Sequence, residues 1–172
     1  MTDYKIYETE RLILKPTTEE DAKFILELLN TPKWIEFVGD RDVKTVEEAG
    51  EYIRIKMLPQ LKRLGYSNCT VIRKVDNCKI GTCGLYDRKG IEGIDIGFAF
   101  LPKYEKKGYA FEAASKMINI AFNELGLTKI NAITIKDNMS SQKLLEKLGM
   151  KFIGLTSIPN DNEELLLYRI KI

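Results

Sequence analysis

The chain has 172 residues, the length of one ordinary domain, at which roughly two-thirds of the surface of the unfolded chain can be buried on folding. Hydrophobic residues make up 44% of it and charged residues 30%, with 12 Gly and 5 Pro, and this composition excludes collagenous, low-complexity and disordered classes. The 27 basic and 25 acidic residues leave a net charge of +2, too balanced to favour nucleic acid or an anionic membrane as the partner. We therefore expect one globular domain over residues 1–172.

Residue types that are missing or rare narrow the chemistry. The sequence has no His, so it lacks the usual general base and the commonest metal ligand. Its three cysteines, Cys69, Cys78 and Cys83, form no C-x-x-C pair, which favours buried thiols in a reducing compartment and no metal site. No apolar run is long enough for a membrane span or a signal peptide, so we expect a cytoplasmic protein. Both a monomer and a homodimer stay open.

The first half of the chain predicts helices followed by a meander of strands. The expected elements are a strand over 11–15, a helix through Asp21 to Leu29 opened by the capping box Thr17-x-x-Glu20, a helix opened by Thr45-x-x-Glu48 and restarted at Pro59 to end near Gly65, and strands over 69–75, 79–86 and 94–101. Residues 32–44 are expected to be irregular.

The second half alternates helices and strands. We expect a helix from Tyr109 that ends at Gly126, a strand over 129–135, a helix over 140–148 stopped by Gly149, and strands over 152–158 and 164–172. The resulting order is β-α-α-β-β-β-α-β-α-β-β, which predicts an α/β fold with a mixed, largely antiparallel sheet.

The junction between strand and helix at 101–111 is the expected anion site, because a helix start exposes unpaired N–H groups and a partial positive charge. Gly108 and Ala110 allow a phosphate to approach the backbone, and Lys106 and Lys107 add positive charge. A P-loop would need Gly-Lys-Ser/Thr, and a Rossmann turn would need two more glycines. The alternative is a plain helix start with solvated lysines.

The strand that precedes this junction has one face of small residues. Gly93, Asp95, Gly97 and Ala99 alternate with the apolar side chains of the opposite face, which reads as core. Glycine in a strand often marks the close approach of a ligand, so we expect a narrow ligand to lie along this face. The alternative is that the small residues accommodate a crossing helix.

A second motif follows a strand and opens a helix, Asn138-Met139-Ser140-Ser141, with a glycine turn at Gly149. Together with Glu105 to Ala110 it resembles the GNAT (GCN5-related N-acetyltransferase) superfamily, whose pyrophosphate loop reads Q/R-x-x-G-x-G/A. The opening Glu10 to Pro16 and the later Phe37-Val38-Gly39-Asp40 are similar to the branch that acetylates the N-terminal residues of ribosomal proteins. The resemblance implies a sheet splayed at the cofactor site.

The resemblance also implies acetyl-CoA as cofactor, no metal, and a set of site residues. The implied cofactor-binding residues are Phe98, Ala99, Phe100, Leu101, Lys106, Lys107, Gly108, Tyr109, Ala110, Phe111, Asn138 and Ser141. Asp95 takes the place of a glutamate general base, and Ser141 that of a serine near the cofactor sulfur. The alternatives are a structural carboxylate paired with a lysine for Asp95 and a first-turn helix serine for Ser141. The sequence departs from the family at Glu105, where Gln or Arg is usual, and at Leu145, where many members have a tyrosine acid.

The expected activity is direct transfer of an acetyl group from acetyl-CoA to a primary amine, foremost the N-terminal α-amine of a protein or peptide. An α-amine, with a pKa near 8, needs only about 1.4 kcal/mol to be neutral at pH 7, whereas a lysine amine needs about 4.6 kcal/mol. The alternatives are acetylation of a small amine, such as a polyamine or an aminoglycoside, and a non-catalytic CoA-binding module.

Overall fold

The computed structural model describes residues 3–172, so Met1 and Thr2 of the predicted domain lie outside the described residues. Its elements in chain order are β1 (Tyr7–Glu8), β2 (Leu12–Pro16), the 3-10 turn η1 (Glu19–Asp21), α1 (Ala22–Leu29), α2 (Pro32–Phe37), α3 (Val46–Lys56), α4 (Leu58–Leu64), β3 (Asn68–Arg73), β4 (Cys78–Tyr86), β5 (Asp95–Phe100), η2 (Pro102–Tyr104), α5 (Tyr109–Asn123), β6 (Lys129–Ile135), α6 (Met139–Lys147), β7 (Lys151–Thr156) and β8 (Leu165–Lys171).

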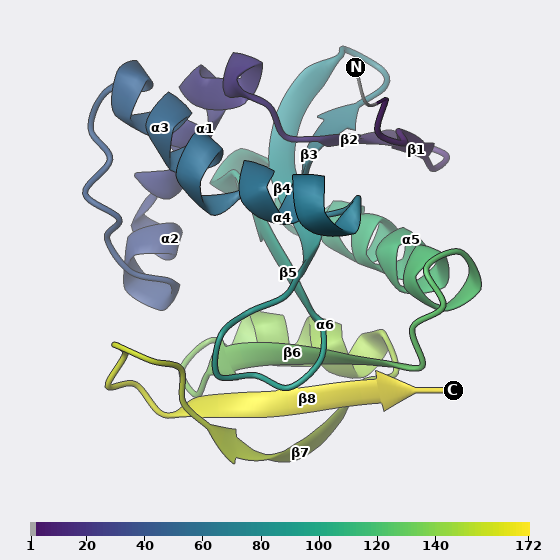
Figure 1. Cartoon of the computed structure of the whole chain (residues 1–172). Coiled ribbons are helices and arrows are strands. Elements are labelled where there is room, and N and C mark those ends of the chain that lie inside the picture. Colours follow the sequence, from purple (N-terminus) through teal and green to yellow (C-terminus); the bar gives the residue numbers. More distant parts are fainter. Residues whose placement is uncertain (1–2) are drawn as a thin grey trace.

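The strands form one eight-stranded sheet in the order β1-β2-β3-β4-β5-β6-β8-β7, as the sequence predicts for a mixed, largely antiparallel sheet. All neighbours pair antiparallel except β5 and β6, which are parallel and share a single register pair, Asp95 with Asn131. Beyond that pair the two strands separate. In Figure 1, β4 and β5 run upright whereas β6, β8 and β7 run across them. The sheet therefore has two halves that meet at one point and leave a gap beside β5.

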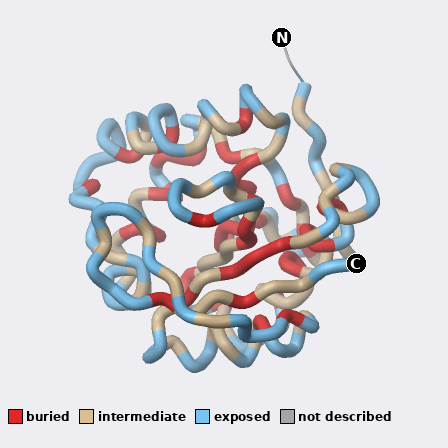
Figure 2. Tube along the Cα trace, turned by 60° about the horizontal axis from the view of Figure 1, so that its bottom comes forward, coloured by how far each residue is buried: buried red, intermediate tan, exposed pale blue. Residues whose placement is uncertain are grey.

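The helices cover the sheet with apolar faces at helical spacing. The long helix α5 packs against β2, β4 and β5 and buries Ala113, Ala114, Met117, Ile120 and Ala121 in the main core. A second, smaller cluster joins α1 to α3. The buried residues, red in Figure 2, follow the strands and the inner sides of the helices. No helix within residues 3–172 is long and apolar enough to cross a membrane.

The first capping box lies one residue later than predicted. Thr18, not Thr17, accepts the hydrogen bond from Glu20 N, and Asp21, not Glu20, accepts from Thr18 N at 3.0 Å. The register differs because Thr17 is fully buried and its hydroxyl bonds to the Thr70 hydroxyl, 2.9 Å away. Tertiary burial of one hydroxyl thus overrides a local capping signal.

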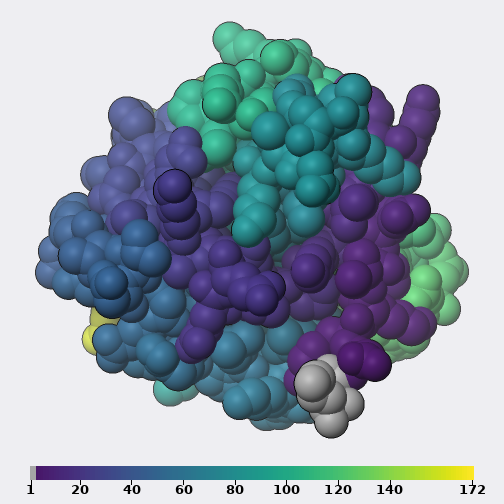
Figure 3. All heavy atoms as spheres, turned by 90° about the horizontal axis from the view of Figure 1, so that it is seen from above, coloured from purple at the N-terminus to yellow at the C-terminus, as the bar shows by residue number. Residues whose placement is uncertain are grey.

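The segment expected to be irregular contains the short helix α2. Thr31 caps it by accepting from Trp34 N, and Pro32 occupies its first turn, where a missing N–H costs nothing. The six-residue helix is too short to show an apolar period. Seen from above in Figure 3, the purple N-terminal segment lies beside the teal β3–β4 hairpin, consistent with the bond from Lys74 N to Arg11 O at 2.9 Å.

Candidate active site

A cavity of about 310 Å³ lies where β5 and β6 separate. Its walls come from β5, the turn before α5, the first turn of α5, the length of α6, and the α1–α2 region. The lining residues are Leu28, Thr31, Lys33, Trp34, Phe37, Val38, Phe98, Ala99, Phe100, Tyr104, Glu105, Lys106, Gly108, Tyr109, Ala110, Phe111, Asn138, Ser140, Ser141, Leu144 and Lys147. Two helix starts and one unpaired strand edge therefore meet in a single site.

The turn before α5 is shaped to bind an anion. Lys106 and Gly108 both adopt left-handed backbone conformations, with φ of 60° and 83°, and successive N–H groups in such a turn form a concave nest. Gly108 is the N-cap of α5, and no side chain caps that helix start. The N–H groups of the first turn are therefore left for a ligand, as a pyrophosphate site requires.

Glu105 places a carboxylate in the turn where the family resemblance would have Gln or Arg. Its carboxylate forms an ion pair with Lys33 of the neighbouring helix α2, so its charge is compensated at the cavity wall. Lys147 adds a further cation, with its Nζ 4.3 Å from the centre of the Phe111 ring. The lining thus holds three lysines against one glutamate, a net charge of +2.

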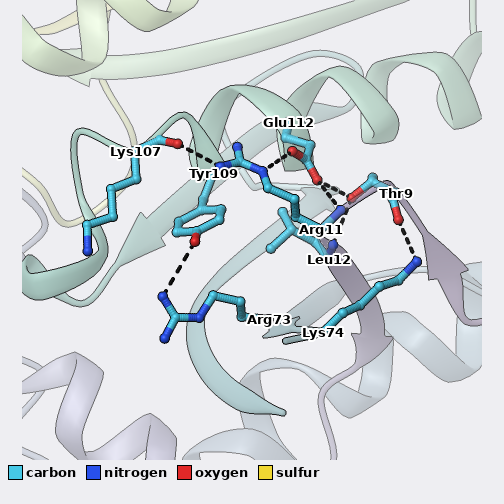
Figure 4. Close-up of polar contacts among 8 residues, drawn as sticks. All are labelled: Thr9, Arg11, Leu12, Arg73, Lys74, Lys107, Tyr109 and Glu112. Carbon is cyan, nitrogen blue, oxygen red and sulfur yellow. Dashed lines mark hydrogen bonds and ion pairs between the residues drawn. The ribbon is translucent and has the colours of Figure 1, made fainter. Parts of the chain in front are cut away.

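Glu112, in the first turn of α5, binds the turn between β1 and β2 (Figure 4). Its carboxylate accepts from Arg11 Nε at 2.8 Å, from Arg11 N at 3.0 Å and from the Thr9 hydroxyl. Burial raises the pKa of this carboxyl, but the hydrogen bonds from Thr9 and Arg11 outweigh that effect and hold it below its usual range. Glu112 thus fixes α5 to the start of the chain, and neither Glu112 nor Arg11 lines the cavity.

The start of α6 lies opposite. Asn138 is the N-cap of α6, and its Oδ1 accepts from Ser141 N at 3.2 Å. This bond uses the Asn138 carbonyl oxygen and leaves its amide nitrogen without a hydrogen-bond partner among residues 3–172. Both residues line the cavity, as predicted. Leu145, which stands where many relatives carry a tyrosine, is buried in the core and does not line it.

Both faces of β5 contribute to the cavity, Ala99 from the small-residue face and Phe98 and Phe100 from the other. Phe98 and Phe100, expected to be core, pack against the main core and also line the cavity. The Tyr86 side chain fills the small-residue face at Gly97, where an added Cβ would lie 2.9 Å from the Tyr86 ring. Gly97 therefore accommodates a ring from the adjacent strand β4, and not the crossing helix that the sequence left open as the alternative.

Asp95 is set apart from the other predicted site residues. Its side chain is 1% exposed, its carboxylate lies 3.3 Å from Arg88 Nη2, and it does not line the cavity. Burial raises the pKa of its carboxyl, and Arg88 opposes that shift. Asp95 lies at the point where β5 and β6 begin to separate, because it forms the one register pair between these strands.

Ten of the twelve predicted cofactor-binding residues line the cavity, and Leu101 and Lys107 do not. Leu101 is buried and its N–H bonds to Ile80 O, whereas the Lys107 carbonyl bonds to Arg11. The sequence missed Thr31, Lys33 and Trp34 of the α1–α2 wall, because no motif marks them. Among residues 3–172, no group of three or more His, Cys, Asp or Glu could hold a metal ion.

This combination of a splayed sheet and an uncapped, glycine-containing helix start is the arrangement expected of an acyl-CoA-dependent transferase. The sequence model of the acetyltransferase (GNAT) domain family matches residues 11–151, and the chain belongs to this family. YoaA, an uncharacterized N-acetyltransferase of Bacillus subtilis, is 28% identical over 153 residues, covering 88% of this chain and 86% of its own.

Solved structures agree with this fold. A GNAT-family acetyltransferase from Bacillus anthracis superposes with a TM-score of 0.79 at 28% identity, covering 97% of this chain and 98% of its own. The ribosomal L7/L12 α-N-protein acetyltransferase RimL, in complex with coenzyme A, superposes with a TM-score of 0.83 at 15% identity, and 98% of each chain is covered. The protein is an acyltransferase of the GNAT family that uses acetyl-CoA as the donor.

Proposed function

We propose that the acceptor is the N-terminal α-amine of a protein or peptide. The observation that carries this proposal is the charge of the cavity wall: its single carboxylate, Glu105, is paired with Lys33, and Lys106 and Lys147 add positive charge. A polycation such as a polyamine or an aminoglycoside would be repelled from such a wall. The resemblance to the ribosomal-protein branch supports the same acceptor.

The ease of deprotonation supports this choice. Neutralising an α-amine at pH 7 costs only about 1.4 kcal/mol, against about 4.6 kcal/mol for a lysine amine. Because the cavity wall has no unpaired carboxylate, it would do little to deprotonate a lysine amine. Trp34, Phe37 and Val38, beside the gap, instead present an apolar surface to the residue that carries the amine.

The proposed reaction is a direct transfer. The neutral amine nitrogen attacks the thioester carbonyl carbon, the C–S bond breaks, the sulfur leaves with the electron pair as a thiolate, and the nitrogen loses its extra proton. The N–H groups at the start of α5 and the unpaired edge of β5 orient the donor, since both lie along the same cavity. We propose Ser141 as the hydrogen-bond donor to the departing sulfur and Asp95 as the proton acceptor, reached through water.

We expect Ser141→Ala to lower kcat by about tenfold to a hundredfold. A thiolate with a pKa near 8.5 needs little proton donation at neutral pH, so the loss of one hydrogen bond has only a modest effect. The measurement is single-turnover acetyl transfer, in which chemistry limits the rate. Ser115→Ala, on α5 and away from the cavity, is the matched control. An unchanged rate in Ser141→Ala would remove Ser141 from the mechanism.

Direct transfer also predicts that the thiols are dispensable. Burial raises the pKa of Cys69 to about 12 and also raises that of Cys83, so both remain protonated at pH 8 and react only as the pH approaches those values. We expect a thiol reagent at pH 8 to modify half-buried Cys78 alone and to leave acetyl transfer intact. An acetyl group found covalently on any cysteine would contradict direct attack.

The acceptor is tested by initial rates of CoA thiol release with a matched panel. One peptide carries a free N-terminus and no lysine, a second has the same sequence with a blocked N-terminus and one lysine, and spermidine and an aminoglycoside complete the set. We expect the first peptide to give the highest kcat/KM. A higher value for the blocked peptide or for a polycation would refute the proposed acceptor.

A further inference from the structure

We propose that Arg11 is a positioning residue for the cofactor loop: it holds the turn of Lys106 to Gly108 in its anion-binding shape from outside the cavity. The inference rests on the use of this turn as the pyrophosphate site. Arg11 belongs to the N-terminal segment, 96 residues before Lys107, whose carbonyl oxygen accepts from Arg11 Nη1 at 3.0 Å. The residue therefore acts on the loop and not on the reacting atoms.

The guanidinium joins the two sides of the helix start. One nitrogen, Nη1, bonds to the Lys107 carbonyl just before α5, and another, Nε, bonds to the Glu112 carboxylate in its first turn at 2.8 Å. Figure 4 shows Arg11 between these two partners. Because the Lys107 carbonyl is directed to Arg11, the loop is held with that acceptor outside the cavity, where it cannot repel an anion.

Aromatic contacts hold the same turn. The Arg11 guanidinium lies 4.3 Å from the centre of the Tyr109 ring, and Tyr109 is the first residue of α5. On the far side, Arg73 Nη1 donates to the Tyr109 hydroxyl at 3.4 Å, and the Arg73 guanidinium stacks 4.8 Å from the Tyr104 ring. Arg11 and Arg73 thus fix Tyr109 at its ring face and its hydroxyl.

The loop needs such support because its backbone is strained. Lys106 is a non-glycine residue with φ of 60°, a conformation that costs free energy and persists when neighbouring structure enforces it. A Cβ built on Gly108 would lie 3.2 Å from Arg11 Nη2, so the guanidinium packs directly against the turn. Lysine cannot replace this contact, since one ammonium group cannot reach a carbonyl and a carboxylate with the planar fork that arginine provides.

The test compares donors with and without the pyrophosphate. We expect Arg11→Gln to weaken CoA binding in calorimetry by about tenfold to a hundredfold and to lower kcat/KM for acetyl-CoA by the same factor. With S-acetylpantetheine, which lacks the pyrophosphate, kcat/KM should stay within about twofold of the wild-type value. Arg11→Lys should resemble Arg11→Gln. The matched control is Lys5→Gln, which breaks the ion pair of Lys5 with Glu124 at the other end of α5 and should change neither donor.

Equal losses with both donors would show that Arg11 supports only the fold and would overturn the proposal, as would unchanged CoA affinity in Arg11→Gln. Failure of the proposed function has a different signature. In that case the wild-type protein would bind CoA but transfer no acetyl group to the peptide panel, and the change in CoA affinity would still decide the role of Arg11.

Discussion

Replacing Gly108 with valine is expected to weaken CoA binding by about a hundredfold or more, which corresponds to about 3 kcal/mol. Gly108 has φ of 83°, a region that is unfavourable for a β-branched residue, so the turn must change shape to admit valine. The new side chain would also displace Arg11, whose Nη2 lies 3.2 Å from the Cβ position. The N–H groups of the turn would then no longer converge on the pyrophosphate. Isothermal titration of CoA measures this loss.

Gly126 provides the matched control for backbone strain. It has φ of 70°, a Cβ there would meet nothing within 4 Å, and it does not line the cavity. We expect Gly126→Val to lower thermal stability as Gly108→Val does while leaving CoA affinity unchanged. Equal CoA affinities in the two variants would exclude the turn before α5 from the cofactor site.

The second large effect concerns Asp95. We expect Asp95→Asn to lower kcat by a factor of about 10² to 10⁴ with little change in the acceptor KM, as the loss of a proton acceptor predicts. Burial raises the pKa of this carboxyl, which makes it a better base than an exposed aspartate. Because Asp95 lies outside the cavity lining, the proposed proton transfer to it requires a bridging water. The pH profile of kcat measures the effect.

A substitution of Arg88 distinguishes the proposed role of Asp95 as a base from a purely structural role. Arg88 stabilises the charged carboxylate, so Arg88→Gln should raise the pKa of Asp95 further. The deprotonated base would then form only at higher pH, and the acid limb of the kcat profile should move to higher pH. If this limb stays in place and Asp95→Asn retains full activity from pH 6 to 9, the amine loses its proton elsewhere.

Local signals explain why much of the fold is predictable. The capping box at Thr45, the glycine stop at Gly65 and the apolar stripe of α5 each act within a few residues, and the structure contains the helices that they predict. The turn at Gly108 is predictable for the same reason, since a glycine before a helix indicates a special backbone conformation. These signals carry the element order.

The parts that sequence reasoning missed depend on contacts between distant residues. Arg11 and Glu112 are 101 positions apart, and Lys33 and Glu105 are 72 apart, so nothing local announces either ion pair. Alternation along β5 defines its two faces, but it does not show that the Tyr86 ring covers the small-residue face at Gly97. Packing between distant residues determines these contacts, so the sequence of a single strand cannot predict them.

The most direct test of the central claim is a crystal structure of the protein with CoA. The predicted result is a pyrophosphate bound by the backbone N–H groups at the start of α5, with the pantetheine arm along Phe98 to Phe100 in the gap between β5 and β6 and the sulfur near Ser141. CoA bound at any other surface, or an empty gap at saturating CoA, would contradict the assignment of this cavity as the acetyl-CoA site.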